Sequence, residues 1–342
     1  MGFSPVKKGY ALAIDAVQWK DIYRINLWSR IANKVFVVLA EQKVMDFDGL
    51  FDLISSLDLK QYISAGHGVR VLAHSRESQL SSTRTIQSIA HKSIVTQLTW
   101  SRDIHWEVDE TKSVIEISVD IYKDMATILL NTSGASLHER GYRTEQWEAP
   151  LKENIASWLL MLGGWNKRGP LFDPFCGSGT ICIEAAMLAA NIAPGLLRSF
   201  AFEEFSCFDG FVWDVLCEEA KQHRQQSIKW AISWSDIDAS VLEKAKANAD
   251  RAGVWHMIDF QERHFLDTKF RSPDDDKVWC VTNPPYGVRL GEESAELVED
   301  LVESFVTHDL FGGFLLLRGA KTPWLVGIDL LNGQQEVCFY QK

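Results

Sequence analysis

Three short stretches in the second half of the chain carry residues that could bind a nucleoside and act on an amine. The first follows a short apolar strand at Leu171 and leads into an apolar helix. Its two glycines give positive-φ freedom and close backbone approach, and its threonine is placed to cap the helix, so a ligand could lie against free backbone N–H groups. Such a turn is by itself also typical of an ordinary strand-to-helix connection. The candidate cofactor-binding residues here are Asp173, Pro174, Phe175, Cys176, Gly177, Ser178, Gly179 and Thr180.

The second stretch, Asp236-Ile237-Asp238, follows an expected strand over residues 230–234. An acid at the first position can accept both hydroxyls of a ribose, while Ile237 can cover the face of an adenine. Alone, an Asp-x-Asp pair is also typical of a helix cap. Beside the glycine turn it indicates a nucleoside site. The spacing lacks the third glycine of the dinucleotide fingerprint and the lysine of a Walker loop, which favours S-adenosylmethionine over NAD or ATP.

The third stretch, Asn283-Pro284-Pro285-Tyr286, follows an expected strand over residues 277–281. Two prolines hold an extended turn, so the Asn283 side chain and the Pro284 carbonyl become fixed hydrogen-bond acceptors. Two acceptors that hold the N–H groups of an exocyclic amine draw its nitrogen towards a tetrahedral, nucleophilic state, ready to take the methyl group of a sulfonium. The Tyr286 ring offers a surface on which a flipped base can stack. All four residues are candidate catalytic residues, and Asn283 also borders the cofactor.

The order of expected elements indicates how these stretches meet. From residue 169 onward, strands alternate with helices, which predicts an α/β fold with a doubly wound, mostly parallel sheet whose last two strands, over 314–318 and 336–340, form an antiparallel edge. Ligands bind beyond the carboxyl ends of such strands. The first part alternates helices and strands and ends in a hairpin around Lys123-Asp124, which predicts a small α+β domain. We expect domains over residues 1–130 and 156–342, joined by a junction over 131–155.

Charge and cysteine usage restrict the partners. The 342 residues carry a formal net charge of −11, and nearly all the excess acid follows residue 150. Residues 66–102 are locally basic, which is compatible with RNA binding and is also typical of a solvated helix face. Six cysteines without a Cys-x-x-Cys pair predict reduced, buried thiols and no metal site. The apolar runs are too short to span a bilayer and no leader opens the chain, so we expect a cytoplasmic protein without a membrane segment.

Several of these motifs resemble known families. Residues 21–30 (Asp-Ile-Tyr-Arg-Ile-Asn-Leu-Trp-Ser-Arg) and the stretch from His74 look like parts of a THUMP domain, an RNA-binding module, here shortened at its N-terminus. The strings Leu-His-x-Arg-Gly-Tyr-Arg (137–143) and Ala-Pro-Leu-Lys-Glu-Asn (149–154) are similar to the junction of the bacterial guanine-N2 methyltransferases of large-subunit ribosomal RNA. The resemblance implies a Rossmann-like, class I methyltransferase domain and a junction that closes one side of the cofactor pocket. The candidate RNA contacts are Arg70, Arg76, Arg84, Lys92 and Arg143.

One position departs from the family pattern. After the third strand the family usually has an acid that contacts the adenine amine of the cofactor, and this chain has His264, with Asp267 three residues later. Either Asp267 or the backbone near His264 takes that role. Both are therefore candidate cofactor residues.

Together, the residues and the resemblance predict an S-adenosylmethionine-dependent RNA methyltransferase acting on the exocyclic N2 amine of a guanine, with large-subunit (23S) ribosomal RNA as the favoured substrate. The alternatives are a transfer-RNA guanine-N2 methyltransferase, a DNA adenine-N6 methyltransferase, and an RNA-binding protein whose methyltransferase fold has lost its activity. A dehydrogenase would need a third glycine and an acid or base beside the nicotinamide, and neither is evident.

Overall fold

The chain divides into two compact units in the computed structural model. The first comprises Met1–Trp28, Asn33–Leu137 and Ser199–Cys217, and the second Ser29–Ala32, His138–Arg198 and Glu218–Lys342. The structure describes residues 6–8, 11–15, 18–64, 66–99, 113–143, 151–167, 169–268, 270, 277–285, 294–317, 325–332 and 335–341.

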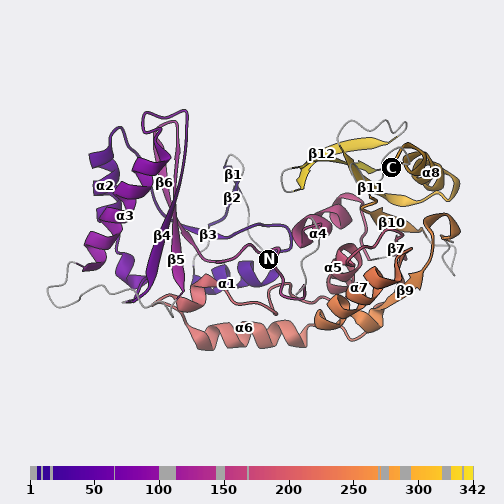
Figure 1. Cartoon of the computed structure of the whole chain (residues 1–342). Coiled ribbons are helices and arrows are strands. Elements are labelled where there is room, and N and C mark those ends of the chain that lie inside the picture. Colours follow the sequence, from indigo (N-terminus) through magenta and orange to yellow (C-terminus); the bar gives the residue numbers. More distant parts are fainter. Residues whose placement is uncertain are drawn as a thin grey trace. The chain divides into compact units, whose positions relative to one another are not determined.

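The first unit contains a four-stranded sheet in the order β3-β6-β5-β4, with α2 and α3 on one side of it (Figure 1). Strands β5 and β6 form the expected hairpin, whose turn residues Lys123 and Asp124 both have positive φ angles, of 52° and 63°. Apolar residues at helical spacing on α3 are fully buried and face the sheet. The elements are β1 (Val6–Lys8), β2 (Ala11–Ala13), α1 (Trp19–Trp28), β3 (Phe36–Lys43), α2 (Phe47–Ser55), β4 (Gly68–Arg76), α3 (Thr83–Thr99), β5 (Val114–Tyr122) and β6 (Met125–Asn131).

An aromatic insertion from the second half of the chain completes this unit. Residues 199–217 pack around the buried Tyr23 of α1, whose ring lies 4.6 Å from that of Phe202 and 6.1 Å from that of Trp213. This arrangement differs from the continuous second domain expected over 156–342, because the insertion buries its aromatic rings against α1. Helix α6 (Gly210–Gln222) begins within the insertion.

The second unit is built on a seven-stranded sheet in the order β12-β13-β11-β10-β7-β8-β9. Strands β11, β10, β7, β8 and β9 are parallel to one another, and β13 pairs antiparallel with both β11 and β12. The expected mostly parallel sheet is therefore confirmed, but the sequence missed β12, which forms the edge. The elements are α4 (Glu153–Leu162), β7 (Leu171–Asp173), α5 (Thr180–Ala189), β8 (Ile232–Asp236), α7 (Ala239–Arg251), β9 (Ile258–Glu262), β10 (Trp279–Thr282), α8 (Ser294–Thr307), β11 (Phe311–Leu317), β12 (Val326–Asn332) and β13 (Gln335–Gln341).

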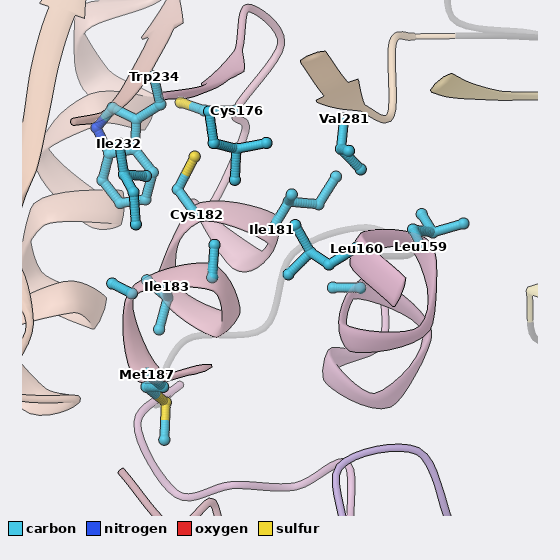
Figure 2. Close-up of a cluster of buried hydrophobic side chains, with 14 of the residues drawn as sticks. Leu159, Leu160, Cys176, Ile181, Cys182, Ile183, Met187, Ile232, Trp234 and Val281 are labelled. Carbon is cyan, nitrogen blue, oxygen red and sulfur yellow. The ribbon is translucent and has the colours of Figure 1, made fainter. Parts of the chain in front are cut away.

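Both faces of this sheet are covered by apolar side chains, as in a doubly wound fold. One core joins α4, α5 and α7 to the sheet through residues such as Val281 and Leu315. The other joins α8 to the opposite face through Cys280 and Phe314. Figure 2 shows the α5 side chains Ile181 and Cys182 in the first core. Because α5 is buried on nearly every side, the loop before it starts from a rigid support.

The strand order reverses between β7 and β10. The chain runs from β7 through β8 to β9 in one direction, and β10 then lies on the other side of β7. The carboxyl ends of β7 and β10 therefore meet at a topological switch point, where ligands bind in open α/β sheets.

The structure also bears on the membrane segment, the metal site and the cysteines considered from the composition. Within the described ranges, no helix has both the length and the hydropathy needed to cross a bilayer. Among the same residues, no three His, Cys, Asp or Glu side chains gather as a metal site would require. All six cysteines are free, and Cys176, Cys182, Cys280 and Cys338 are buried.

Candidate functional site

The loop after β7 is held by its neighbours in the sheet. The Cys176 N–H donates to the Ser235 carbonyl at 3.1 Å, and the Gly177 N–H donates to Asp236 Oδ2 at 3.0 Å. From α7, the Asn248 amide donates to the Ser178 carbonyl at 3.1 Å. The first two expected stretches thus lie together, and Asp236 fixes the shape of the loop.

The two glycines of this loop have different requirements. Gly179 has φ +82°, and a Cβ there would lie 2.5 Å from the Trp234 ring, so both its backbone and its surroundings demand glycine. Gly177 has φ +50°, and nothing lies within 4 Å of the place a Cβ would take. That side of the loop is therefore open to a ligand. Gly179 also takes the N-cap position of α5, so the expectation that Thr180 caps the helix is wrong.

Asp173 is the last residue of β7, and its buried carboxyl accepts two hydrogen bonds. Its side chain is 1% exposed, and its Oδ1 accepts from the Thr282 hydroxyl at 2.6 Å and from the Phe175 N–H at 3.3 Å. Burial raises the pKa of Asp173 to about 7, the two hydrogen bonds oppose that rise, and the nearby Asp236 adds to it. Asp173 therefore titrates near neutral pH, and a cation bound close to it would favour its ionised form.

The acceptor stretch begins where β10 ends, next to β7. Asn283 is half-buried, and its Oδ1 is a buried acceptor for which the described residues provide no donor. Pro284 is buried and Pro285 half-buried. Tyr286 lies outside the described residues. A buried acceptor without a donor is uncommon in folded proteins, and its presence indicates a place for a ligand N–H group.

The residues expected around an adenine lie at the ends of β8 and β9. Ile237 is 68% exposed, directly after Asp236. His264 caps the short helical turn Phe265–Asp267, because its Nδ1 accepts from the Leu266 N–H at 3.3 Å. Asp267 is exposed, and so is Leu266, at 60%. The sequence reasoning did not single out Leu266, an exposed apolar side chain that follows β9 much as Ile237 follows β8.

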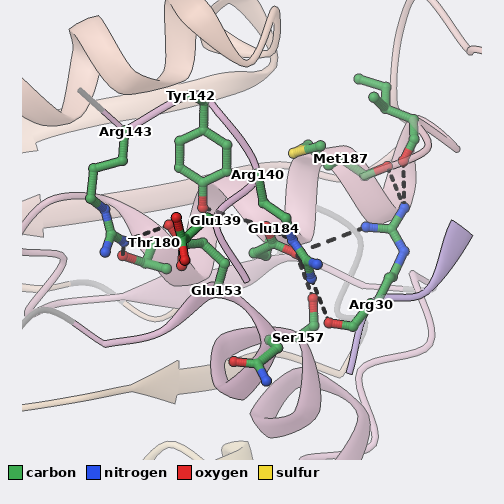
Figure 3. A network of polar contacts seen from close by, with 12 residues as sticks. Arg30, Glu139, Arg140, Tyr142, Arg143, Glu153, Ser157, Thr180, Glu184 and Met187 are labelled. Atoms are coloured by element: carbon green, nitrogen blue, oxygen red, sulfur yellow. Dashed lines mark hydrogen bonds and ion pairs between the residues drawn. The ribbon is translucent and has the colours of Figure 1, made fainter. Parts of the chain in front are cut away.

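A buried ion pair ties the junction to α5. Arg140 and Glu184 are 1% and 0% exposed, and two guanidinium nitrogens each lie 3.4 Å from a carboxylate oxygen (Figure 3). Glu184 also accepts from Ser157 Oγ at 2.5 Å and from the Tyr142 hydroxyl at 3.4 Å. The network fixes residues 138–143 against the helix that carries the glycine loop. The junction motif includes Arg140, but the sequence predicted no buried ion pair for it or for Glu184, since a junction arginine and a helix glutamate ordinarily lie in solvent.

Arg143 occupies the same network. Its Nη2 donates to Thr180 Oγ1 at 2.6 Å and to the Leu151 carbonyl at 3.3 Å, and lies 3.5 Å from Glu153 (Figure 3). Its side chain is 13% exposed. Burial outweighs the attraction of Arg143 and raises the pKa of Glu153 to about 7. Arg143 thus contacts the first residue of α5, in a position that differs from the exposed one expected of an RNA contact.

The remaining basic residues lie on the first unit, on two different surfaces. Arg70 and Arg76 are exposed on β4 and alternate with side chains that face α3. Arg84 and Lys92 are exposed on α3, where they share one helix face with His91. His67, counted as part of the basic stretch, is instead buried, with its Nδ1 3.0 Å from Ser64 Oγ.

These features fit S-adenosylmethionine. The loop is open beside Gly177, an acid stands at the end of β8, and apolar side chains follow both β8 and β9. Asp173 could balance a cationic ligand, and Asn283 presents an acceptor on the next strand end.

Two family models match different parts of this chain. Residues 140–308 match a family model described as "RMKL-like, methyltransferase domain", and residues 44–131 match the THUMP domain model. "Putative RNA methyltransferase YpsC" of Bacillus subtilis is 35% identical over 94% of this chain and 85% of its own length. "Ribosomal RNA large subunit methyltransferase K/L" of Shewanella sp. ANA-3 is 36% identical over 93% of this chain, which spans 46% of that relative.

Two solved structures match this chain over nearly its whole length. One is described as "SMU.472, a putative methyltransferase complexed with SAH"; it has a TM-score of 0.85 and 31% identity, and the match covers 99% of this chain and 91% of that one. Another, from Listeria monocytogenes, is described as a predicted N6-adenine-specific DNA methylase. It has a TM-score of 0.86 and 30% identity, and the match covers 100% of this chain and 90% of that one.

Proposed function

Because this chain belongs to the RMKL-like methyltransferase family and carries a THUMP domain, we propose that it transfers a methyl group from S-adenosylmethionine to the N2 amine of a guanine in large-subunit ribosomal RNA. The observation that carries the proposal is the buried acceptor oxygen of Asn283, which follows the strand beside the glycine loop. Residues 1–130, completed by the insertion 199–217, then form the RNA-binding part, 131–155 the junction and the rest of 156–342 the catalytic part.

The residues at the ends of β7, β8 and β9 would hold the cofactor, which supplies an electrophilic methyl group on a sulfonium. Asp236 would accept the ribose hydroxyls, and Ile237 and Leu266 would cover the adenine. The open side of Gly177 lets the loop backbone approach the ligand. Asp173, buried behind the loop, offers a carboxylate whose charge suits a cationic ligand.

The residues at the end of β10 would prepare the amine. Asn283 Oδ1 and the Pro284 carbonyl accept its two N–H groups and hold the nitrogen lone pair out of conjugation with the ring. Because Asn283 Oδ1 is already buried, little solvent has to be displaced when the amine arrives. Tyr286 would stack on the flipped base. No side chain has to remove a proton first, since the nitrogen loses its proton to water after the methyl has been transferred.

The raised pKa of Asp173 predicts that cofactor affinity depends on pH. The free protein holds a proton on Asp173 up to a pKa of about 7, and a cationic ligand displaces it, so affinity must rise as the pH rises. Between pH 6 and 7.5 we expect Kd to fall by about five- to tenfold. Isothermal titration with S-adenosylmethionine at several pH values measures this.

Two variants test whether Asp173, and not another carboxyl, causes the pH dependence of cofactor affinity. Asp173→Asn should bind more weakly and lose the pH dependence. Glu153→Gln removes another carboxyl of the second unit whose pKa is raised to about 7, and this variant should keep the pH dependence. A slope that survives in Asp173→Asn would contradict the assignment.

The RNA contact is proposed on the outer face of α3. Arg84, His91 and Lys92 are exposed on one helix face, and no acidic partner of Arg84 or Lys92 is found among the described residues. On β4, by contrast, acidic residues of β5 lie beside the basic ones: Glu116 is opposite Arg70 in the strand register, and His74 Nδ1 lies 3.0 Å from Asp120. Net positive charge is therefore concentrated on the helix, where phosphates would find the stronger attraction.

Removing that charge should weaken RNA binding. The double variant Arg84→Gln, Lys92→Gln is expected to raise the Kd for ribosomal RNA about tenfold at moderate salt and to lower the slope of log K against log salt by about two. The matched control Arg70→Gln, Lys123→Gln removes two exposed charges elsewhere on the same unit and should change Kd by less than about threefold. Equal losses in both double variants would contradict the placement on α3.

A DNA adenine-N6 methyltransferase is the second candidate. The description of the Listeria monocytogenes structure favours it, and two acceptors at the end of β10 suit any exocyclic amine. Incubation with labelled cofactor and equal amounts of total RNA and DNA separates the candidates. Label in RNA supports the first, and label confined to DNA would overturn it.

A further inference from the structure

Thr282 joins the two halves of the proposed site. It is the last residue of β10, is 0% exposed, and its hydroxyl donates to Asp173 Oδ1 at 2.6 Å. Asp173 is the last residue of β7, the parallel neighbour of β10. The hydrogen bond therefore crosses the switch point, with the glycine loop on one side and Asn283 on the other. None of the motifs in the sequence includes Thr282.

The bond constrains the backbone that presents the acceptors. A threonine side chain is stiff at χ1, and the hydrogen bond that the Thr282 hydroxyl donates fixes its rotamer. The next residue is Asn283, whose side-chain oxygen has no donor among the described residues to hold it. After it comes Pro284, which removes a backbone donor and restricts Asn283 to extended conformations. The hydrogen bond from Thr282 to Asp173 therefore holds the residue directly before the acceptor group.

The charge of Asp173 decides how strong this bond is. A hydroxyl that donates to an ionised carboxylate makes a stronger bond than one to a neutral acid. The other titratable groups that act on Asp173 or are acted on by it are Asp236 on β8, Cys176 in the loop, Cys182 on α5 and Cys280 on β10. Burial raises the pKa of each of the three thiols well above its usual value, so they stay neutral. Asp236 is the neighbouring acid that raises the pKa of Asp173.

We propose that Thr282 is a positioning residue that couples the cofactor acid Asp173 to the acceptor group of Asn283. When Asp173 is ionised, as it is beside a cationic cofactor, the Thr282 hydroxyl holds the end of β10 and Asn283 is fixed to receive the amine. When Asp173 is protonated, the end of β10 is held less firmly. The inference rests on the proposed function and adds that cofactor binding and acceptor positioning share one hydrogen bond.

Two substitutions test the role of the hydroxyl. Thr282→Val keeps the shape and removes the donor, while Thr282→Ser keeps the donor and removes a methyl group. We expect Thr282→Val to lower kcat at least tenfold with KM for RNA changed less than threefold, and Thr282→Ser to recover kcat to within threefold of the wild type. If Thr282→Val does not fold, as judged by circular dichroism, Thr282→Ala takes its place.

The pH dependence of cofactor binding distinguishes this role from a purely structural one, because a purely structural role of Thr282 would leave that dependence unchanged. The Thr282 hydroxyl lowers the pKa of Asp173, so its loss should shift the pH at which the affinity for S-adenosylmethionine rises to a higher value. Thr282→Ser should leave that pH unchanged. Wild-type kcat in Thr282→Val, or an unshifted pH dependence of cofactor binding, overturns the inference.

The Asn283→Ala variant, assayed alongside, separates this inference from the proposed function. Loss of activity in Asn283→Ala with wild-type behaviour in Thr282→Val overturns the role of Thr282 alone. Full activity in Asn283→Ala overturns the proposed mechanism and the coupling to Asn283 with it.

Discussion

Replacement of Asn283 by alanine is expected to lower kcat for methyl transfer by about a thousandfold or more, while Kd for S-adenosylmethionine changes by less than about threefold. The reason is that Asn283 Oδ1 is a buried acceptor without a donor among the described residues, which in our account serves the incoming amine. The loop that would hold the cofactor is fixed separately, by Asp236 and Asn248. Single-turnover kinetics and calorimetric titration measure the two quantities.

Asn283→Asp is the matched control for that variant. It keeps an acceptor oxygen in the same place, so it should retain more activity than Asn283→Ala. Turnover at the wild-type rate in Asn283→Ala would rule out the acceptor role.

Replacement of Arg140 by methionine is expected to lower the free energy of unfolding by about 3–5 kcal/mol. It would leave the carboxylate of Glu184, which is 0% exposed, with only hydroxyl donors at hydrogen-bonding distance and Arg30 4.0 Å away. Denaturant unfolding followed by tryptophan fluorescence, together with hydrogen exchange in α5, measures the loss. Since the chain has two compact units, the exchange data assign the loss to the second.

Two controls define what is lost in Arg140→Met. The double variant Arg140→Met, Glu184→Met removes both charges of the pair and should recover part of the stability, because the buried Arg30 then loses the acid 4.0 Å away. Lys246→Met breaks an exposed pair with Glu243 and should cost less than about 1 kcal/mol. A cost for Arg140→Met as small as that for Lys246→Met would show that the buried pair contributes little.

Much of the catalytic fold could be predicted from the sequence because its signals are local. Strands that alternate with helices predicted the parallel sheet, and each candidate stretch follows a strand, so the three were expected at one edge. The hydrogen bonds from Gly177 to Asp236 and from Thr282 to Asp173 confirm that the ends of β7, β8 and β10 lie together. The roles assigned to the site residues stay predictions.

The features that were missed depend on contacts between distant parts of the chain. Strand β12 carries exposed Val326 and Leu331, at 65% and 67%, and its pattern resembles a surface loop. Arg140 and Glu184 are 44 residues apart, and only the fold brings them together in a buried site. From the sequence, the aromatic residues near Phe202 were assigned to the second domain, because no sequence pattern indicates their contact with the distant Tyr23.

The central claim is the identity of the product, and mass analysis of nucleosides tests it most directly. The protein is incubated with labelled S-adenosylmethionine and with purified ribosomal and transfer RNA from cells that lack it, with Asn283→Ala as the blank. Our account predicts labelled N2-methylguanosine in large-subunit ribosomal RNA and none in the blank. Label found as N6-methyladenine, or N2-methylguanosine confined to transfer RNA, would contradict it.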